Sequence, residues 1–196
     1  MCVELGGLAQ EMKIYLHRDI VSENGLEKGM EISENEADEL MYRNDVRRAK
    51  ERALYLLEGR EYSYSSLFDK LEQNYDEDVC FEVCNKMKEL GLLDDRRYAE
   101  KLCRQLFEVK KFGRYRVRME MKMKGISPEL AEEMIELYCE ENNVLEGLEE
   151  LVERKYERYL TDRKGVEKVK AALVRKGYSY SDIREVLDMY DLDFDE

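Results

Sequence analysis

Over most of the chain, apolar side chains recur at intervals of three and four residues, the pattern of helices that bury one face. Residues that begin and end helices divide this pattern. Ser127-Pro128 places a capping serine before a proline at the first helical position. Gly91, Gly125 and Gly177 stand where helices should end. The sequence therefore predicts nine helices, at residues 45–58, 63–74, 77–90, 95–111, 114–124, 128–140, 144–160, 163–176 and 180–190.

The first part of the chain follows a different pattern. Residues 12–16 alternate apolar and polar side chains, which indicates a strand. Turns are predicted at 17–19 and at 25–29, and residues 30–32 could supply a second strand. This pattern favours one or two short strands or a hairpin. Residues 33–44 then form either the start of a helix or a polar linker.

The nine helices group into three units of one plan. Ser63, Gly113 and Arg163 stand 50 residues apart, and each opens a short helix that follows a longer one and precedes another short one. A module of this size is too small to bury a good core alone, so the modules should stack. We therefore expect an all-α protein with three tandem three-helix repeats in an elongated curved array, after a short N-terminal β-strand or irregular segment. The predicted divisions are 1–44 for the N-terminal strand and linker region, and 45–92, 93–141 and 142–196 for the repeats, the last with an acidic tail.

Composition excludes several classes of protein. The 196 residues are 43% hydrophobic, which is too apolar for a disordered chain. The mean hydropathy is −0.70, and no stretch approaches the roughly 20 apolar residues that span a bilayer. The first residues lack the pattern of a secretory signal. We therefore expect a cytoplasmic protein without membrane contact. The formal net charge of −13 argues against a general nucleic-acid coat, whose surface should be basic.

The charge is distributed unevenly. Residues 94–125 hold eleven basic and five acidic residues, a net charge of +6, and residues 154–178 hold nine and three, again +6. Both segments cover the long helix and the next short helix of a repeat, so stacking in register would align them on one face. We predict a basic stripe there, the alternative being the charged, solvated face of any helix. Its candidate residues are Arg96, Arg97, Lys101, Arg104, Lys110, Lys111, Arg114, Arg116, Arg118, Lys122, Arg163, Lys164, Lys168, Arg175 and Lys176.

Such a stripe has two possible uses. It could neutralise phosphates, in which case binding weakens with salt, or it could meet the acidic surface of a protein filament. Tyr98, Phe107, Phe112 and Tyr115 interleave with the charges and could stack on bases. Aromatic residues at helical spacing are more often part of a core, which is the interpretation we favour.

Residues suited to catalysis or metal binding are sparse. His17 is the only histidine, and no glycine-rich phosphate loop occurs. Asp94 is better explained as a helix N-cap than as half of an acid–base pair with Asp95, because adjacent helical residues do not face each other. We interpret the cysteines as small buried hydrophobes rather than ligands; they are Cys2, Cys80, Cys84, Cys103 and Cys139. The sequence predicts a protein that is not an enzyme, with no metal and no cofactor.

Four segments of the sequence are distinctive, and they are Ala53-Leu-Tyr-Leu-Leu-Glu-Gly-Arg-Glu-Tyr-Ser63, Leu90-Gly-Leu-Leu-Asp-Asp-Arg-Arg-Tyr-Ala99, Lys124-Gly125-Ile126 and Val169-Lys-Ala-Ala-Leu-Val-Arg-Lys-Gly-Tyr-Ser179. These segments resemble the RecX family of recombinase regulators. They fall in order at the repeat spacing, within a match from about residue 12 to residue 190. The resemblance implies a non-enzymatic regulator that binds the RecA–DNA filament and mainly inhibits its recombinase and ATPase activities in DNA repair, homologous recombination and the SOS response. It also implies an all-helical array of three-helix repeats.

Two other hypotheses stay open. The chain could be an autonomous DNA-binding helical array that uses the same stripe, or a helical scaffold for an unrelated acidic partner. The net charge of −13 disfavours bare DNA but not a protein filament that already carries DNA. We therefore expect the RecA filament with single-stranded DNA as the partner, with weak or indirect DNA contact. No long heptad seam predicts a coiled-coil dimer, so we expect a monomer.

Overall fold

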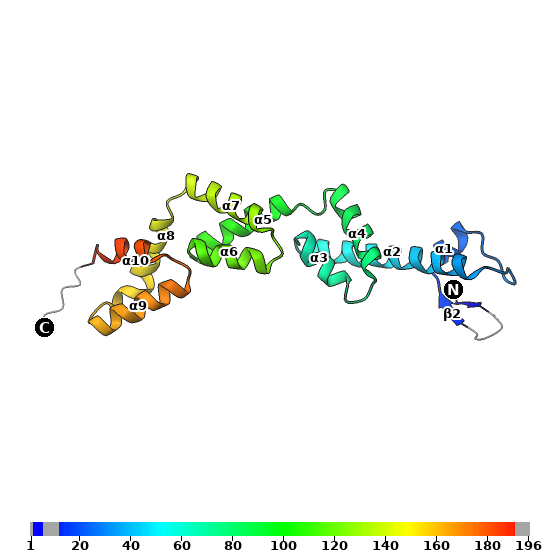
Figure 1. Ribbon diagram of the computed structural model, residues 1–196, viewed down its shortest axis with the longest axis horizontal. Helices are drawn as coiled ribbons and strands as arrows, with labels where there is room; N and C mark the ends of the chain where they lie inside the picture. The colour runs from blue at the N-terminus through cyan, green and yellow to red at the C-terminus, as the bar shows by residue number, and fades with distance from the viewer. Residues whose placement is uncertain (1, 6–11, 191–196) are drawn as a thin grey trace. The chain divides into compact units, whose positions relative to one another are not determined.

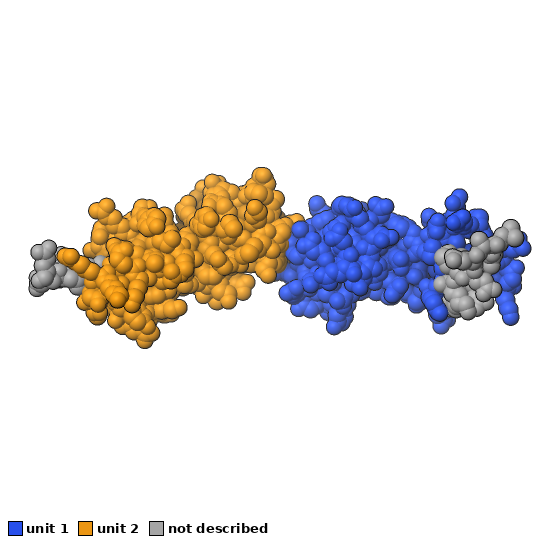
Figure 2. Space-filling view, turned by 60° about the horizontal axis from the view of Figure 1, so that its bottom comes forward, with its two compact units in different colours: residues 1–93 blue, residues 94–196 orange. Residues whose placement is uncertain are grey.

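Helices make up nearly all the regular structure of the described residues. The computed structural model describes residues 2–5 and 12–190, with side chains from Ile14 onward. They fall into two compact units, Met1–Leu93 and Asp94–Glu196 (Figure 2). The helices are α1 (Arg18–Glu23), α2 (Glu34–Gly59), α3 (Tyr64–Leu71), α4 (Glu77–Glu89), α5 (Asp95–Arg104), α6 (Arg114–Met123), α7 (Pro128–Glu141), α8 (Val144–Leu151), α9 (Arg163–Arg175) and α10 (Tyr180–Leu187) (Figure 1).

The first unit opens with a two-stranded antiparallel hairpin. Strand β1 (Cys2–Leu5) pairs with β2 (Met12–Tyr15), so that Cys2 lies opposite Tyr15. The predicted strand at residues 12–16 is therefore confirmed in all but its last residue. Its partner is β1 and not residues 30–32, which form no strand, so that part of the prediction is wrong.

Helix α1 replaces the turn predicted at residues 17–19. His17 caps this helix, because its Nδ1 accepts a hydrogen bond from the Asp19 N–H at 3.2 Å. Ile20 and Val21 on α1 are buried against Leu40 of α2. The prediction failed because the six-residue helix is too short to show a periodic pattern, and its formation depends on this packing.

Helix α2 begins eleven residues before the predicted helix start at 45. A capping box fixes its first turn: the Ser33 N–H donates to the Glu36 carboxylate at 2.7 Å, and the Glu36 N–H donates to the Ser33 hydroxyl at 3.3 Å. Residues 33–44 are thus the start of a helix and not a linker. The predicted division after residue 44 lies inside α2, whose second half belongs to the first repeat.

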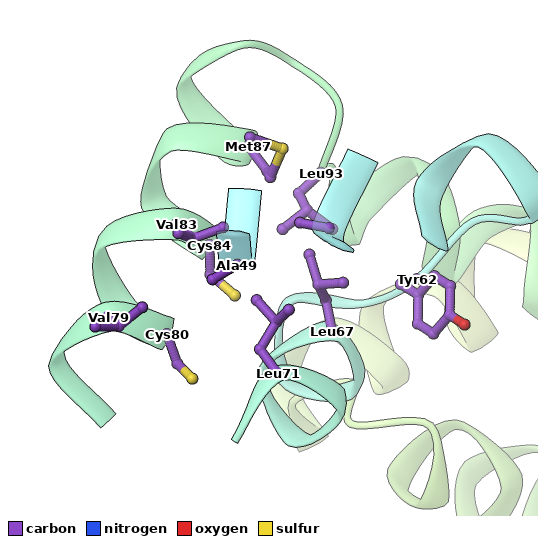
Figure 3. Packing of buried hydrophobic residues seen from close by; sticks show 11 residues of the cluster. Ala49, Tyr62, Leu67, Leu71, Val79, Cys80, Val83, Cys84, Met87 and Leu93 are labelled. Atoms are coloured by element: carbon purple, nitrogen blue, oxygen red, sulfur yellow. The ribbon is translucent and has the colours of Figure 1, made fainter. Parts of the chain in front are cut away.

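The first repeat consists of α2, α3 and α4 around one core. Leu67 and Leu71, four residues apart on α3, point toward α4, where Cys84 is fully buried, and Ala49 on α2 completes the contact (Figure 3). The small side chain of Ala49 lets α4 approach α2 closely. Burying one leucine in this way contributes about 1.5–3 kcal/mol relative to leaving it exposed.

The second unit contains two more repeats of the same plan, each with its own core. Repeat 2 is built by α5, α6 and α7 around Val117, Met121 and Ile135, and repeat 3 by α8, α9 and α10 around Leu173 and Ile183 (Figure 1). The all-α class, the threefold three-helix plan and the short N-terminal strand segment are therefore confirmed. The elongated curved form of the array stays a prediction.

The long helices of repeats 2 and 3 are less regular than predicted. Helix α5 continues as a π-helix over Gln105–Val109. Helix α8 continues as a π-helix over Val152–Tyr156 and a 3-10 turn over Glu157–Tyr159. The predicted helices at 95–111 and 144–160 are thus correct in extent to within two residues, but wrong as uninterrupted α-helices. Hydrophobic spacing does not separate these forms over a single turn, because their periods differ by less than one residue per turn.

Several predicted helix boundaries are confirmed, but the predicted ends at residues 74 and 190 are wrong, because α3 ends at Leu71 and α10 at Leu187. The side chains of Ser63, Asp94, Ser127, Asp162 and Ser179 each accept a hydrogen bond from a backbone N–H of the helix that follows. Arg163 is consequently the first residue of α9 rather than its cap. Left-handed φ angles of 69°, 75° and 91° occur at the three glycines predicted to end helices, which are Gly91, Gly125 and Gly177.

The described cysteines are buried or partly buried, as expected for small hydrophobic side chains. Cys80, Cys84 and Cys103 are buried and Cys139 is partly buried, all as free thiols. The Cys2 side chain lies outside the described residues. Within the described part of the chain, no three potential ligands cluster as a metal site, and no helix is long and apolar enough to span a membrane.

Candidate basic interface in repeats 2 and 3

A backbone joint connects repeat 2 to repeat 3 within the second unit. The N–H of Gly113, the N-cap of α6, donates to the carbonyl of Lys176 at 2.9 Å, and the Tyr115 N–H donates to the carbonyl of Gly177 at 3.2 Å. Free amides at the start of α6 are thereby satisfied by free carbonyls at the end of α9. The Tyr178 hydroxyl adds a hydrogen bond to the Lys111 carbonyl at 3.2 Å. This joint sets how the basic residues of the two repeats are placed relative to each other.

Several candidate cations of repeat 2 are already paired with carboxylates. Arg118 forms the best pair, a two-pronged contact with Glu132 at 2.6 and 2.7 Å, which lowers the pKa of that carboxyl. The other pairs are Arg96 with Glu133, Arg104 with Glu100 and Glu141, Lys111 with Glu150, and Arg116 with Glu120. Each is largely exposed or half-buried, so each pair stabilises the fold only modestly and reduces the charge available to a partner.

The other candidates of repeat 2 have more varied surroundings. Arg97 and Lys101 are exposed on α5, where the Arg97 N–H also donates to the capping carboxylate. Arg114 is exposed at the start of α6. Lys110 and Lys122 are exposed, and no carboxylate of the described residues lies within ion-pair distance of either.

The candidates of repeat 3 are the more available ones. Arg163, Lys164, Lys168 and Arg175 are all exposed on α9, and the described residues offer none of them an ion pair. Available positive charge is therefore concentrated along one helix. This is the part of the predicted stripe that the structure leaves least neutralised.

Lys176 links the basic residues of the two repeats. Its ammonium donates to the Lys110 carbonyl at 2.9 Å and lies 4.9 Å from the centroid of the Phe112 ring, a cation–π contact. Burial, and then the charges of Lys155 and Lys110, lower the pKa of Lys176. Repelling cations are thus held close together where repeats 2 and 3 meet.

The aromatic candidates divide between core and surface. Phe107 is buried and stacks on Tyr138 with ring centroids 4.5 Å apart, and Phe112 is half-buried at the joint. Tyr98 is half-buried against the core of repeat 2, whereas Tyr115 is 64% exposed. The prediction of core packing is therefore confirmed for Phe107 and wrong for Tyr115.

Sequence reasoning left out four residues that lie beside the available lysines. Lys155, Tyr156, Arg158 and Tyr159 line a hollow of about 480 Å³ together with α9. Lys155 and Arg158 were counted in the basic segment 154–178, but within repeat 3 the predicted stripe included only residues from Arg163 onward. The signal that would have found them is the alternation of basic residues and tyrosines at the end of the first helix of the repeat.

The comparisons with known proteins follow the three repeats in order. Family models described as the first, second and third three-helix domains of RecX match residues 49–87, 94–135 and 141–187. The chain belongs to the RecX family. Each matched segment contains most of one hydrophobic core, so the family models and the packing divide the molecule similarly.

Two curated relatives cover most of this RecX-family chain. The regulatory protein RecX of Trichlorobacter lovleyi is 30% identical over 140 residues, which are 69% of this chain and 91% of the relative. That of Clostridioides difficile is 28% identical over 185 residues, 93% of this chain and 86% of the relative. Both relatives are named as regulatory proteins.

Two solved RecX structures have a similar fold. RecX from Lactobacillus salivarius aligns with a TM-score of 0.67 and 29% identity, over 76% of this chain and 98% of that one. A second regulatory protein RecX aligns with a TM-score of 0.72 over 94% of this chain and 93% of that one. At 21% identity the second likeness shows the fold alone.

Proposed function

We propose that this chain binds a RecA–DNA filament and limits its recombinase and ATPase activities without being an enzyme itself. Membership of the RecX family supports this, because the curated relatives are named as regulators. The observation that carries the proposal is the basic surface of repeats 2 and 3 in a chain whose net charge is −13. A polarised surface of this kind suits an acidic, elongated partner better than it suits bare DNA.

The unpaired cations of this surface would provide orientation, and the number of repeats would provide avidity. Three similar modules could contact several protomers of a filament at once, which strengthens binding without requiring any single contact to be tight. The ion-paired arginines of repeat 2 would contribute less, because a partner must first compete with Glu120, Glu132 or Glu133. Filaments too short to reach all modules should be bound weakly.

The proposal is tested by the ATP hydrolysis of RecA from the same organism on single-stranded DNA, with and without this protein. The wild-type chain should lower the hydrolysis rate and sediment together with the filaments. Lys110→Glu with Lys122→Glu should weaken both effects, whereas the matched change Lys50→Glu with Lys88→Glu in repeat 1 should not. Failure of the wild-type chain to inhibit hydrolysis and to co-sediment would refute the proposal.

A further inference from the structure

A hollow in repeat 3 is lined by cations without acidic partners among the described residues. It lies between the N-terminal half of α9 and the turns that follow α8, and its volume is about 480 Å³. Lys155, Arg158, Lys164 and Lys168 line it, and no described carboxylate lies within ion-pair distance of any of them. The single acid of the wall, Asp162, has its carboxylate turned to the backbone of α9, where it accepts the capping hydrogen bond at 2.5 Å.

Two tyrosines share this wall with the cations. Tyr159 is 48% exposed, and the Arg158 guanidinium lies 4.8 Å from the centroid of its ring. The Lys155 ammonium lies 5.6 Å from the centroid of the Tyr156 ring. The hollow therefore offers flat aromatic surface and positive charge side by side.

The walls of the hollow are tied together by the backbone. A Cβ on Gly165 would approach the carbonyl oxygen of Tyr159 closer than 3.0 Å, so α9 packs directly on the turn that carries the tyrosine. Val166 and Val169 of α9 are buried in the core of repeat 3, and Val169 also lines the hollow, so this wall is anchored in the core. The hollow is consequently a preformed feature of the repeat, and a ligand would not have to order it first.

The chemistry of the wall distinguishes between two kinds of anionic ligand. An acidic peptide would use the lysines but has no need of an adjacent exposed ring. A nucleotide uses both, since its phosphate is attracted to the ammonium groups and its base stacks on an aromatic face. The volume also lies within the roughly 300–1,000 Å³ of ordinary ligand pockets.

We propose that this hollow binds one nucleotide unit, with the base against Tyr159 and the phosphate between Lys164 and Lys168. The inference rests on the proposed function for its biological source, a strand displaced or presented by the filament, but a free nucleotide offers the same chemistry. The nucleotide would be recognised by stacking and by charge, so binding should depend little on base sequence.

The test measures fluorescence anisotropy of a labelled oligothymidylate with the full chain at low salt and no RecA. Lys164→Gln with Lys168→Gln should weaken binding about ten-fold or more, and Tyr159→Ala about five-fold or more. The matched controls are Lys50→Gln with Lys88→Gln in repeat 1, which changes the net charge equally, and Tyr180→Ala, which removes another exposed tyrosine. Both controls should bind within about two-fold of the wild type, and circular dichroism should show every variant folded.

Competition identifies the source of the ligand. Displacement of the oligonucleotide by millimolar ATP supports a site for free nucleotides and strands alike, and displacement only by unlabelled oligonucleotide supports a strand site. Equal losses in the two lysine pairs, a silent Tyr159→Ala, or displacement by polyglutamate as readily as by oligonucleotide would overturn the proposal. Because RecA is absent, failure here leaves filament inhibition intact, and failure of filament inhibition leaves this binding measurable.

Discussion

The joint between repeats 2 and 3 predicts a large effect from the smallest possible substitution, Gly113→Ala. The φ and ψ angles of Gly113 are −78° and 165°, which alanine adopts without strain. The added Cβ would nevertheless approach the carbonyl of Gly177 and the amide of Tyr178 closer than 3.0 Å, a separation that real Cβ atoms essentially never show. Both contacts are with backbone atoms, so the end of α9 has to move away from the start of α6.

The magnitude follows from the hydrogen bonds that this movement breaks. Two backbone bonds cross the joint here, at 2.9 and 3.2 Å, and each contributes about 0.5–1.5 kcal/mol to stability. We therefore expect Gly113→Ala to reduce the free energy of unfolding by about 1–3 kcal/mol. Repeat 3 should also lose its coupling to repeat 2, which lowers the apparent denaturant m-value of the transition.

Urea unfolding followed by circular dichroism at 222 nm measures both quantities. Gly59→Ala is the matched control, because Gly59 ends α2 in open space with no atom within 4 Å of an added Cβ. That change should leave stability unchanged or raise it by up to about 1 kcal/mol. A midpoint for Gly113→Ala equal to that of the wild type or of Gly59→Ala would refute the reasoning about the joint.

Three further predictions concern a cap, an ion pair and the buried thiols. Asp94→Ala should cost about 1 kcal/mol in urea unfolding, and Asp94→Asn should retain most of the cap. Glu132→Gln should cost about 0.5–1 kcal/mol at pH 7. Arg118 holds the pKa of Glu132 below its usual range, so this stabilisation is fully present above that range and is lost as the pH falls through the lowered pKa of the folded chain. Burial raises the pKa of Cys84 and of Cys103 to about 12, so iodoacetamide at pH 8 followed by peptide mass spectrometry should find both unmodified until urea unfolds the chain.

Each of these predictions has an outcome that contradicts it. Equal losses for the two Asp94 variants would mean that the carboxylate acts by its charge and not as a cap. A cost of Glu132→Gln that does not shrink as the pH falls would show that the ion pair with Arg118 is not its source. Rapid alkylation of Cys103 in the folded chain would mean that the core of repeat 2 opens far more easily than its packing implies.

The hydrophobic period was sufficient to predict the helices because each buries one continuous face. It located α7 to within one residue at either end, since Ser127 and Pro128 mark its start independently. It could not show α1, whose two buried residues are too few for a period, nor the π-helical turn over Gln105–Val109. The hydrophobic pattern predicts a helix only where the helix is long enough for the pattern to repeat.

The basic surface was predictable in location but not in strength. Counting charges along the sequence finds the positive segments, but the acids that neutralise Arg96 and Arg118 lie on α7, 37 and 14 residues later in the chain. Those partners are set by how α7 packs on α5 and α6 and by no spacing within the segment. The available charge is accordingly greater in repeat 3, although the two segments carry the same net charge.

The start of the middle helix of each repeat shows how one structural requirement is met in three ways. The free amides are capped by the hydroxyl of Ser63 in repeat 1 and by the carboxylate of Asp162 in repeat 3. Repeat 2 has Gly113 at this position, without a capping side chain, and the carbonyls of Lys176 and Gly177 supply the missing acceptors. A cap side chain makes a helix start self-sufficient, whereas its absence makes α6 depend on the next repeat. Gly113 is therefore the residue at which repeat 2 depends on repeat 3. The hydrophobic spacing that predicts the helices of each repeat does not predict this connection between repeats.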